Sequence, residues 1–298
     1  MERVSFRDQI SRNKWKSVFL IIGIFFVFLI LGYVIGIALG PDYFTIIMIL
    51  ATIISLIYLV IGYYYSANIA LASVKAKPAS SGDYPQFHQV VEGLCLASGL
   101  PKPKLYVMNN NDINAFASGR NPQNAVVCVT TGALEKLNKQ ELEGVLAHEL
   151  GHVANYDIRF MTLVAVLVGM ISIISQIFLR SLFFAHLDSE DKKGNALFII
   201  IGIVLAILAP IVVSLVQLAI SRKREYTADA SCVKFVRSPT GLISALKKID
   251  KEKQTEEDKA IPKAVATMFI SDPFKKRFED MFSTHPSIRK RIEILERM

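Results

Sequence analysis

At the centre of the chain, residues 138–155 read NKQELEGVLAHELGHVAN. Asn138 followed by Glu141 has the spacing of a capping box, in which each side chain bonds the backbone N–H of the other residue at the start of a helix. Apolar side chains then recur at helical spacing, at Leu142, Val145, Leu146 and Leu150. The pattern predicts a helix that begins after Asn138, buries one face and continues through the two histidines.

The histidines of this helix form the motif HELGH at residues 148–152. Four residues turn a helix by about 400°, so His148 and His152 lie on one face, one turn apart. Neutral imidazoles in this arrangement are typical ligands of Zn²⁺. Glu149 lies about 100° from His148, where it can take a proton from a water molecule beside the metal rather than bind the metal. We therefore predict one zinc ion per chain, with Glu149 as the catalytic acid and base.

A catalytic zinc site usually has three protein ligands and one open position. The best candidate for the third ligand is Glu225, in the run EYTAD at residues 225–229. Asp229 lies four residues further on the same helical face, where it can accept the free N–H of a ligand histidine and fix its orientation. A local salt bridge to the basic residues 222–224 is the alternative for Glu225, and the HELGH motif favours the ligand role.

Four stretches of the chain contain no Asp, Glu, Lys or Arg: residues 17–38, 44–65, 160–179 and 196–219. Each is long enough to cross a bilayer core of about 30 Å as a helix. The other 210 residues include all 60 charged residues of the chain. About 29% of this remainder is therefore charged, which is typical of a soluble domain. The sequence predicts a mainly α membrane protein with four transmembrane helices and a polar α+β domain.

These stretches divide the chain into five parts. We predict an N-terminal segment (1–16), two transmembrane helices (17–65), the first part of the polar domain with the HELGH helix (66–159), two more transmembrane helices with a short external loop (160–219), and the second part of the polar domain (220–298). The third and fourth spans therefore separate Glu225 from the two histidines.

The net charge of +8 comes largely from basic residues beside the predicted spans. They are Arg3, Arg7, Arg12, Lys14, Lys16, Lys75, Lys77, Arg222, Lys223 and Arg224. Cytoplasmic segments carry such an excess, so both termini and the polar domain are predicted to face the cytoplasm. Anionic lipid headgroups, rather than nucleic acid, then account for the charge. The spans lack the ionisable residues that mark transport pathways, which excludes a transporter.

Other patterns predict further elements of the polar domain. Helices are expected at residues 87–97, 241–249 and 286–298, and strands at 105–108 and 125–129. Within the first span, Gly32 and Gly36 have a spacing that lets another helix approach, although such glycines are also common background in membrane helices. We interpret them as background.

The motifs together resemble a known family. HELGH at 148–152, REYTAD at 224–229, NAFAS at 114–118 and STHPS at 283–287, with the four-span layout, are similar to the HtpX membrane zinc metalloproteases, relatives of the CaaX prenyl proteases. The resemblance covers essentially the whole chain. It implies a cytoplasmic gluzincin-like zinc protease domain in the bacterial cytoplasmic (inner) membrane, and an endopeptidase that acts in quality control of damaged or misfolded membrane proteins.

The resemblance assigns the residues found above to the same roles: His148, His152 and Glu225 to zinc, Glu149 to catalysis and Asp229 to the support of a ligand. It adds Asn114, on a strand at the edge of the cleft where substrate can add as a further strand, and His285, which can stabilise the oxyanion. Each has a plainer alternative, since Asn114 can shape a turn and His285 can cap the last helix. We interpret Asp157 as the cap of the third span, with orientation of a ligand as the alternative.

A non-proteolytic, zinc-stabilised membrane scaffold is the alternative to a protease. A membrane scaffold can use zinc only for stability, with no proteolysis. Structural zinc sites are closed by four protein ligands, whereas this sequence shows three and a carboxylate beside the open position. The sequence therefore favours a protease whose partners are membrane protein substrates and the lipid bilayer.

Overall fold

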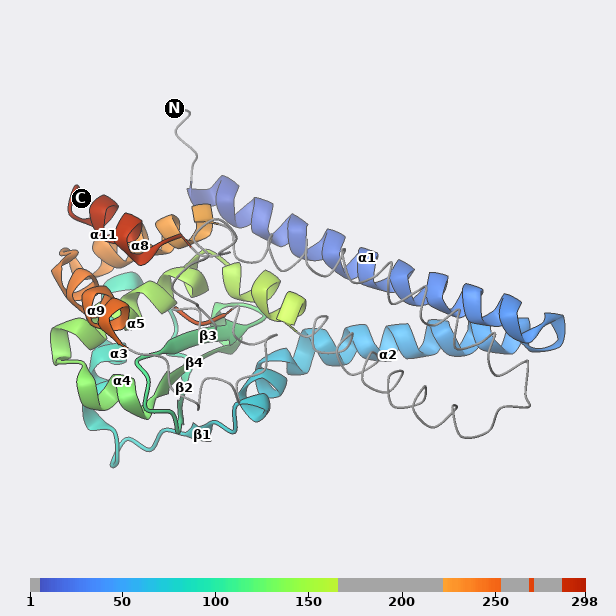
Figure 1. Cartoon of the computed structure of the whole chain (residues 1–298), viewed down its shortest axis with the longest axis horizontal. Helices are drawn as coiled ribbons and strands as arrows, with labels where there is room; N and C mark the ends of the chain where they lie inside the picture. Colours follow the sequence, from blue (N-terminus) through green and yellow to red (C-terminus); the bar gives the residue numbers. More distant parts are fainter. Residues whose placement is uncertain (1–5, 166–221, 253–267, 271–285) are drawn as a thin grey trace.

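The computed structural model describes residues 6–165, 222–252, 268–270 and 286–298 (Figure 1). Two long helices, α1 (Phe6–Leu39) and α2 (Pro41–Ser73), lie side by side and project from a body built around a small sheet. Both are long and apolar enough to cross a membrane, as the sequence predicts for residues 17–38 and 44–65. Apart from residues 160–165, the third and fourth predicted spans and the loop between them lie outside the described residues.

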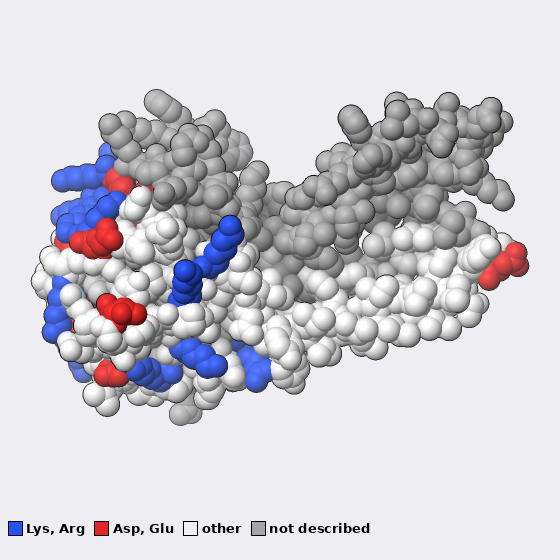
Figure 2. All heavy atoms as spheres, turned by 90° about the horizontal axis from the view of Figure 1, so that it is seen from below, with Lys and Arg blue, Asp and Glu red and all other residues white. Residues whose placement is uncertain are grey.

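The surface of the helix pair is apolar. Large side chains that are about half exposed cover it, among them Phe26, Ile30, Ile46, Ile53 and Ile57. Figure 2 shows charged side chains over the body, whereas the described part of the projecting helices carries charge on this face only at its far tip. Water is an unfavourable environment for such a surface, so the pair is suited to the interior of a bilayer.

Close packing between α1 and α2 depends on glycine. A Cβ atom on Gly32 would lie 2.3 Å from the Cβ of Ala51, and one on Gly36 would lie 2.9 Å from the ring of Phe44. Gly40 then joins the helices with a φ of 100°, in the region that favours glycine. The interpretation of Gly32 and Gly36 as background is therefore wrong, because both allow the second helix to approach the first.

In the described part of the chain, the sheet has four strands in the order β1-β2-β4-β3: β1 (Lys77–Pro78), β2 (Lys104–Met108), β4 (Ala125–Thr130) and β3 (Ala115–Gly119). β2 is parallel to β4, with Tyr106 opposite Cys128, and β3 is antiparallel to β4, with Phe116 opposite the same cysteine. The predicted strands at 105–108 and 125–129 are confirmed as β2 and β4. β3 forms one edge of the sheet, where the backbone N–H of Ile270 donates to the carbonyl oxygen of Ala115 at 3.0 Å.

Alternate residues of β4 face two different cores, which explains its continuous apolar run AVVCVT. Val127 and Val129 pack among the residues of the HELGH helix, α5 (Lys139–Ala154). Val126 and Cys128 point the other way, into a cluster that includes Ala70 and Leu71 from the end of α2. The end of α2 is therefore packed directly onto the sheet that supports α5.

Among the described residues, α5 packs against the helices α3 (Pro85–Ser98), α8 (Arg222–Val236) and α9 (Thr240–Lys251), and α11 (Ile288–Leu295) packs against α8 and α9. The short segments η1 (Pro122–Asn124) and α4 (Thr131–Lys136) flank β4. α3, α9 and α11 confirm the helices predicted at 87–97, 241–249 and 286–298, with α11 shorter than predicted. In the body, α5 therefore lies between the sheet and the helices that follow the predicted membrane spans.

Gly144 lets α9 cross close to α5. A Cβ atom there would lie 2.4 Å from the backbone nitrogen of Leu242 and 2.8 Å from the carbonyl carbon of Gly241. Both neighbours are backbone atoms, so neither can move without shifting α9. In contrast, a Cβ atom on Gly93 of α3 would meet nothing within 4 Å.

We expect Gly144→Ala and Gly93→Ala to change stability in opposite directions. Overpacking at Gly144 should lower the free energy of unfolding by about 2 kcal/mol, whereas alanine at the exposed helical Gly93 should raise it by about 0.5–1 kcal/mol. Thermal unfolding of the two purified variants in detergent provides the comparison. Equal melting temperatures would contradict the close crossing of α5 and α9.

Candidate metal centre

The capping box places the start of α5. The side-chain oxygen of Asn138 accepts from the backbone nitrogen of Glu141 at 2.9 Å, and the carboxylate of Glu141 accepts from the backbone nitrogen of Asn138 at 2.8 Å. The helix then presents His148 and His152 on one face, with ring centroids 4.8 Å apart. The sequence-based prediction of this helix and of its paired imidazoles is confirmed.

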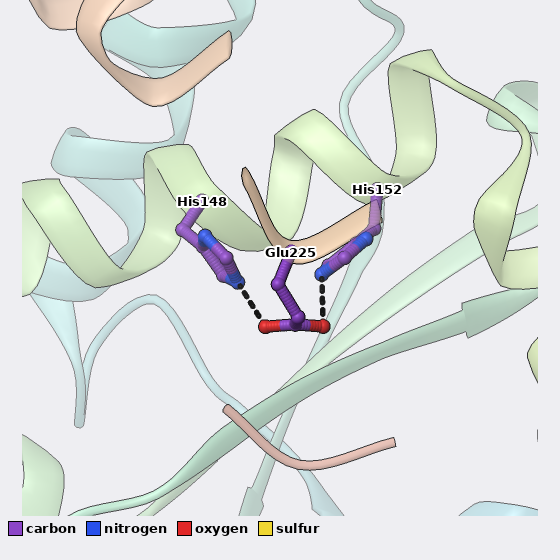
Figure 3. Close-up of side chains that lie close together, drawn as sticks. All are labelled: His148, His152 and Glu225. Atoms are coloured by element: carbon purple, nitrogen blue, oxygen red, sulfur yellow. Dashed lines mark ion pairs between the residues drawn. The ribbon is translucent and has the colours of Figure 1, made fainter. Parts of the chain in front are cut away.

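Helix α8 brings Glu225 to the same point. The Nε2 atoms of His148 and His152 each lie 3.6 Å from a different carboxylate oxygen of Glu225, as Figure 3 shows. One donor atom from each of the three buried residues lies within 4.8 Å of the others. Two imidazole nitrogens and a carboxylate oxygen are a donor set that suits zinc, so the residues fit the predicted metal.

Gly151, inside the HELGH motif, allows α8 to come this close. A Cβ atom at Gly151 would lie 3.0 Å from the carbonyl oxygen of Ala228 and 3.0 Å from the Cβ of Ser231. Such contacts are tighter than ordinary packing, and a larger side chain would push α8 away. Because Glu225 is on α8, its distance from the histidines depends on this glycine.

The second ring nitrogen of each histidine faces a buried carboxylate. Nδ1 of His148 lies 2.9 Å from Asp229, as predicted, and Nδ1 of His152 lies 3.2 Å from Asp157. Such contacts leave Nε2 as the metal-binding atom and fix the ring orientation. Asp157 stands at the start of the helix that begins the third predicted span, where we interpreted it as a cap. Its carboxylate instead contacts His152, which agrees with the alternative that it orients a ligand.

Arg291 of α11 adds a buried positive charge beside these carboxylates, and the sequence analysis missed it. The side chain is 1% exposed, and its Nη2 and Nε atoms donate to the two carboxylate oxygens of Asp229 at 2.7 and 3.0 Å. Its Nη1 atom also lies 3.5 Å from Glu225. One signal could have revealed it: Arg291 occupies the same helical face as the inward residues Ile288 and Leu295.

Glu149 is buried beside the histidines. Among the described residues, no side chain donates a hydrogen bond to its carboxylate oxygens, and the backbone N–H of Ala117 favours its ionised form only weakly. Burial raises the pKa of Glu149 to about 7, although His148 and His152 oppose the shift. A carboxyl group with this pKa exchanges protons readily at neutral pH, as a general acid and base must.

Two further predicted residues have different outcomes. Asn114 is buried immediately before the edge strand β3, and its side-chain oxygen accepts from the backbone nitrogen of Ala115 at 3.0 Å. This contact agrees with the turn-shaping alternative, and the substrate-binding role of Asn114 stays a prediction. His285 lies outside the described residues.

Metal binding should release protons. Burial and the Arg291 cation lower the pKa of His148, but hydrogen bonds to Asp229 and Glu225 outweigh them and raise it to about 9. Metal-free His148 is therefore protonated at pH 7.5, and a bound metal must displace this proton. We expect at least about one proton released per zinc ion at pH 7.5, and an affinity that increases as the pH rises toward 9. Calorimetric titration in two buffers with different ionisation enthalpies measures the release, and a value of zero would contradict it.

Comparisons with known proteins show the family to which the chain belongs. The family profile described as Peptidase family M48 matches residues 82–298. The Protease HtpX homolog of Caldanaerobacter subterraneus subsp. tengcongensis is 45% identical over 254 residues, which are 84% of each chain. The Protease HtpX homolog of Streptococcus agalactiae serotype III is 40% identical over 297 residues, 98% of this chain and 99% of the relative. The crystal structure of S. mikatae Ste24p matches with a TM-score of 0.46 and 17% identity, over 96% of this chain and 66% of that longer chain.

The matches extend over the regions that hold the site. The profile includes α5, α8 and α11, which carry the histidines, Glu225 and Arg291. The relative from Streptococcus agalactiae also spans α1 and α2. The chain therefore belongs to peptidase family M48, and it is a metallopeptidase with HtpX proteases among its relatives.

Proposed function

We propose that the protein is a zinc-dependent endopeptidase that cleaves membrane proteins at the cytoplasmic face of the bilayer. One observation carries this proposal: His148, His152 and Glu225 converge from two helices beside the buried carboxylate of Glu149. When bound there, zinc would polarise the scissile carbonyl group and lower the pKa of the water molecule that attacks it. A purely structural zinc site would have a fourth protein ligand, and the metal group found among the described residues has three.

In the proposed reaction, the residues of this chain bind the metal and transfer one proton. Glu149 takes a proton from water as the oxygen attacks the carbonyl carbon, and then gives it to the nitrogen as the C–N bond breaks. The products are a carboxylic acid and an amine, and transfer of the remaining water proton between them gives a carboxylate and an ammonium group at neutral pH. Asp229 and Asp157 keep the ligand rings oriented during these steps, and His285 remains our candidate for stabilising the oxyanion.

Metal replacement tests the zinc proposal. We expect chelator-treated protein in detergent to lose cleavage of an unfolded protein substrate, and one equivalent of Zn²⁺ to restore it. Mg²⁺ should not restore it, because it prefers oxygen ligands. Purified protein that binds one zinc ion per chain but cleaves no peptide bond would support the zinc-stabilised scaffold instead.

The location of the site suggests which substrates it takes. His152 precedes the apolar stretch that begins at residue 160, and Glu225 follows the one that ends at residue 219. The metal centre is therefore expected close to the bilayer surface, and resemblance to the HtpX family supports misfolded or damaged membrane proteins as substrates. Cleavage of one sequence presented on a membrane anchor and as a detached peptide tests this access, and equal rates would count against it.

A further inference from the structure

The turn after α5 has an unusual backbone conformation. Asn155 ends the helix, Tyr156 has a φ of 59°, and the next helix starts at Asp157. A non-glycine residue in the left-handed region is uncommon and needs support from its surroundings. The conformation of this turn determines where the carboxylate of Asp157 lies, and one of its oxygens contacts the ligand His152.

The support comes from α1. Asn13, which is 4% exposed, uses its side-chain nitrogen for two hydrogen bonds to this turn. Nδ2 donates to the backbone carbonyl oxygen of Asn155 at 2.9 Å and to Oδ1 of Asp157 at 2.7 Å. A neutral amide can donate both bonds, whereas a carboxylate at this position could donate neither while ionised.

Two other residues of α1 lie at this point but do not contact Asp157 in the described structure. Nζ of Lys14 lies 4.4 Å from the centre of the Tyr156 ring. The hydroxyl of Ser17 donates to the backbone carbonyl oxygen of Asn13 at 2.9 Å. The chain thus offers two neighbouring side chains of α1 as controls: Lys14 contacts the turn at Tyr156, and Ser17 bonds only its own helix.

The two carboxylate oxygens of Asp157 contact two different residues. Oδ1 accepts from Asn13, and Oδ2 lies 3.2 Å from Nδ1 of His152. We propose that Asn13 is a positioning residue of the metal centre: it fixes Asp157, which in turn orients His152, so that the first apolar helix tunes the affinity for the metal. This inference rests on the proposed function only in that a metal binds to His148, His152 and Glu225.

The test compares full-length variants in detergent. Asn13→Ala removes both donors, and the matched controls Lys14→Ala and Ser17→Ala change α1 beside it. Zn²⁺ affinity is measured by competition with a chromophoric chelator, and the visible spectrum of the Co²⁺-loaded protein reports the geometry of the ligands. Loss of an outer partner of a ligand weakens metal binding by about 10–100-fold. We expect about tenfold for Asn13→Ala, a shifted Co²⁺ spectrum, and less than about twofold for both controls.

Two further variants separate positioning from folding. Asn13→Asp is isosteric and should weaken Zn²⁺ binding at least as much as Asn13→Ala, because two carboxylates would face each other. The double variant Asn13→Asp, Asp157→Asn restores one hydrogen bond, in which the amide at position 157 now donates to the carboxylate at position 13. It should recover part of the Zn²⁺ affinity. Melting temperatures of all these variants well above the assay temperature would exclude a role in folding alone, because the protein would then be folded whenever zinc binding is measured.

The possible results differ for the two proposals. Wild-type protein that binds no Zn²⁺ would overturn both. Wild-type protein that binds Zn²⁺ and cleaves substrate, with an unchanged affinity and Co²⁺ spectrum in Asn13→Ala, would overturn only the role of Asn13. Equal weakening in Asn13→Ala and Lys14→Ala would also overturn it, because docking of α1 would then be sufficient.

Discussion

A Glu149→Gln variant should bind one zinc ion per chain and cleave peptide bonds about 1,000-fold more slowly than the wild-type protein. Removal of a general acid and base costs a factor of about 10²–10⁴. Glutamine has the size of glutamate but cannot accept the proton from the attacking water. The metal-binding residues are unchanged, so zinc should remain. Metal analysis and initial cleavage rates on the same sample measure both effects.

The matched control is Glu143→Gln, the same change at a partly exposed position on the same helix. It should leave the rate within about twofold. Burial disfavours the charged form of Glu149, so the uncharged Glu149→Gln variant should also melt no earlier than the wild type. A Glu149→Gln enzyme that retains zinc and full activity would show that the proposed proton transfer is wrong.

The same inactive variant can identify substrates. Proteins that enter the site would remain bound because the bond is not cleaved. Recovery of misfolded membrane proteins with Glu149→Gln from membranes, compared with Glu143→Gln, would support the proposed quality-control role. Recovery of folded soluble proteins alone would contradict it.

Arg291→Met should cause the largest loss of stability, and the loss should be greater without metal. Arg291 donates to Asp229 and lies beside Glu225, and all three side chains are buried. Removing one partner of a buried ion pair costs about 3–5 kcal/mol, because the remaining charge has no partner. Zinc supplies positive charge at the same place, so it should restore part of the stability. Melting temperatures with and without Zn²⁺ measure both effects.

Two controls make this prediction specific. Arg289→Met, an exposed position on α11, should change the free energy of unfolding by less than about 0.5 kcal/mol. Combining Arg291→Met with Asp229→Asn removes the unpaired charge and should recover part of the loss. If both arginine variants melt at the same temperature, the buried charge pair is not important for stability.

Most of the metal site could be predicted from the sequence because its geometry is local. His148 and His152 lie four residues apart on one helix, and the same spacing relates Glu225 to Asp229. Helical periodicity then determines that each pair shares a face. The capping box of Asn138 and Glu141 fixed the start of the helix in the same local way. Only the contact between α5 and α8 could not be predicted from periodicity. It followed from the assumption that a zinc site needs a third ligand.

The contacts that were missed join residues far apart in the chain. Arg291 is 62 residues from Asp229, and Asn13 is 144 residues from Asp157. No periodicity specifies such a pair, and a polar residue before an apolar span resembles many others at membrane boundaries. Strand β3, with its small residues AFASG, has weak strand propensity. It was expected only through the family resemblance.

The buried carboxylate of Glu149 also matters for engineering. Burial of this ionisable group is unfavourable, as its raised pKa shows, so this residue makes the fold less stable than an apolar side chain of similar size would. Enzymes commonly show such a trade-off between stability and activity. A library of variants screened only for heat resistance would therefore become enriched in inactive proteins, and a useful screen must select for cleavage at the same time.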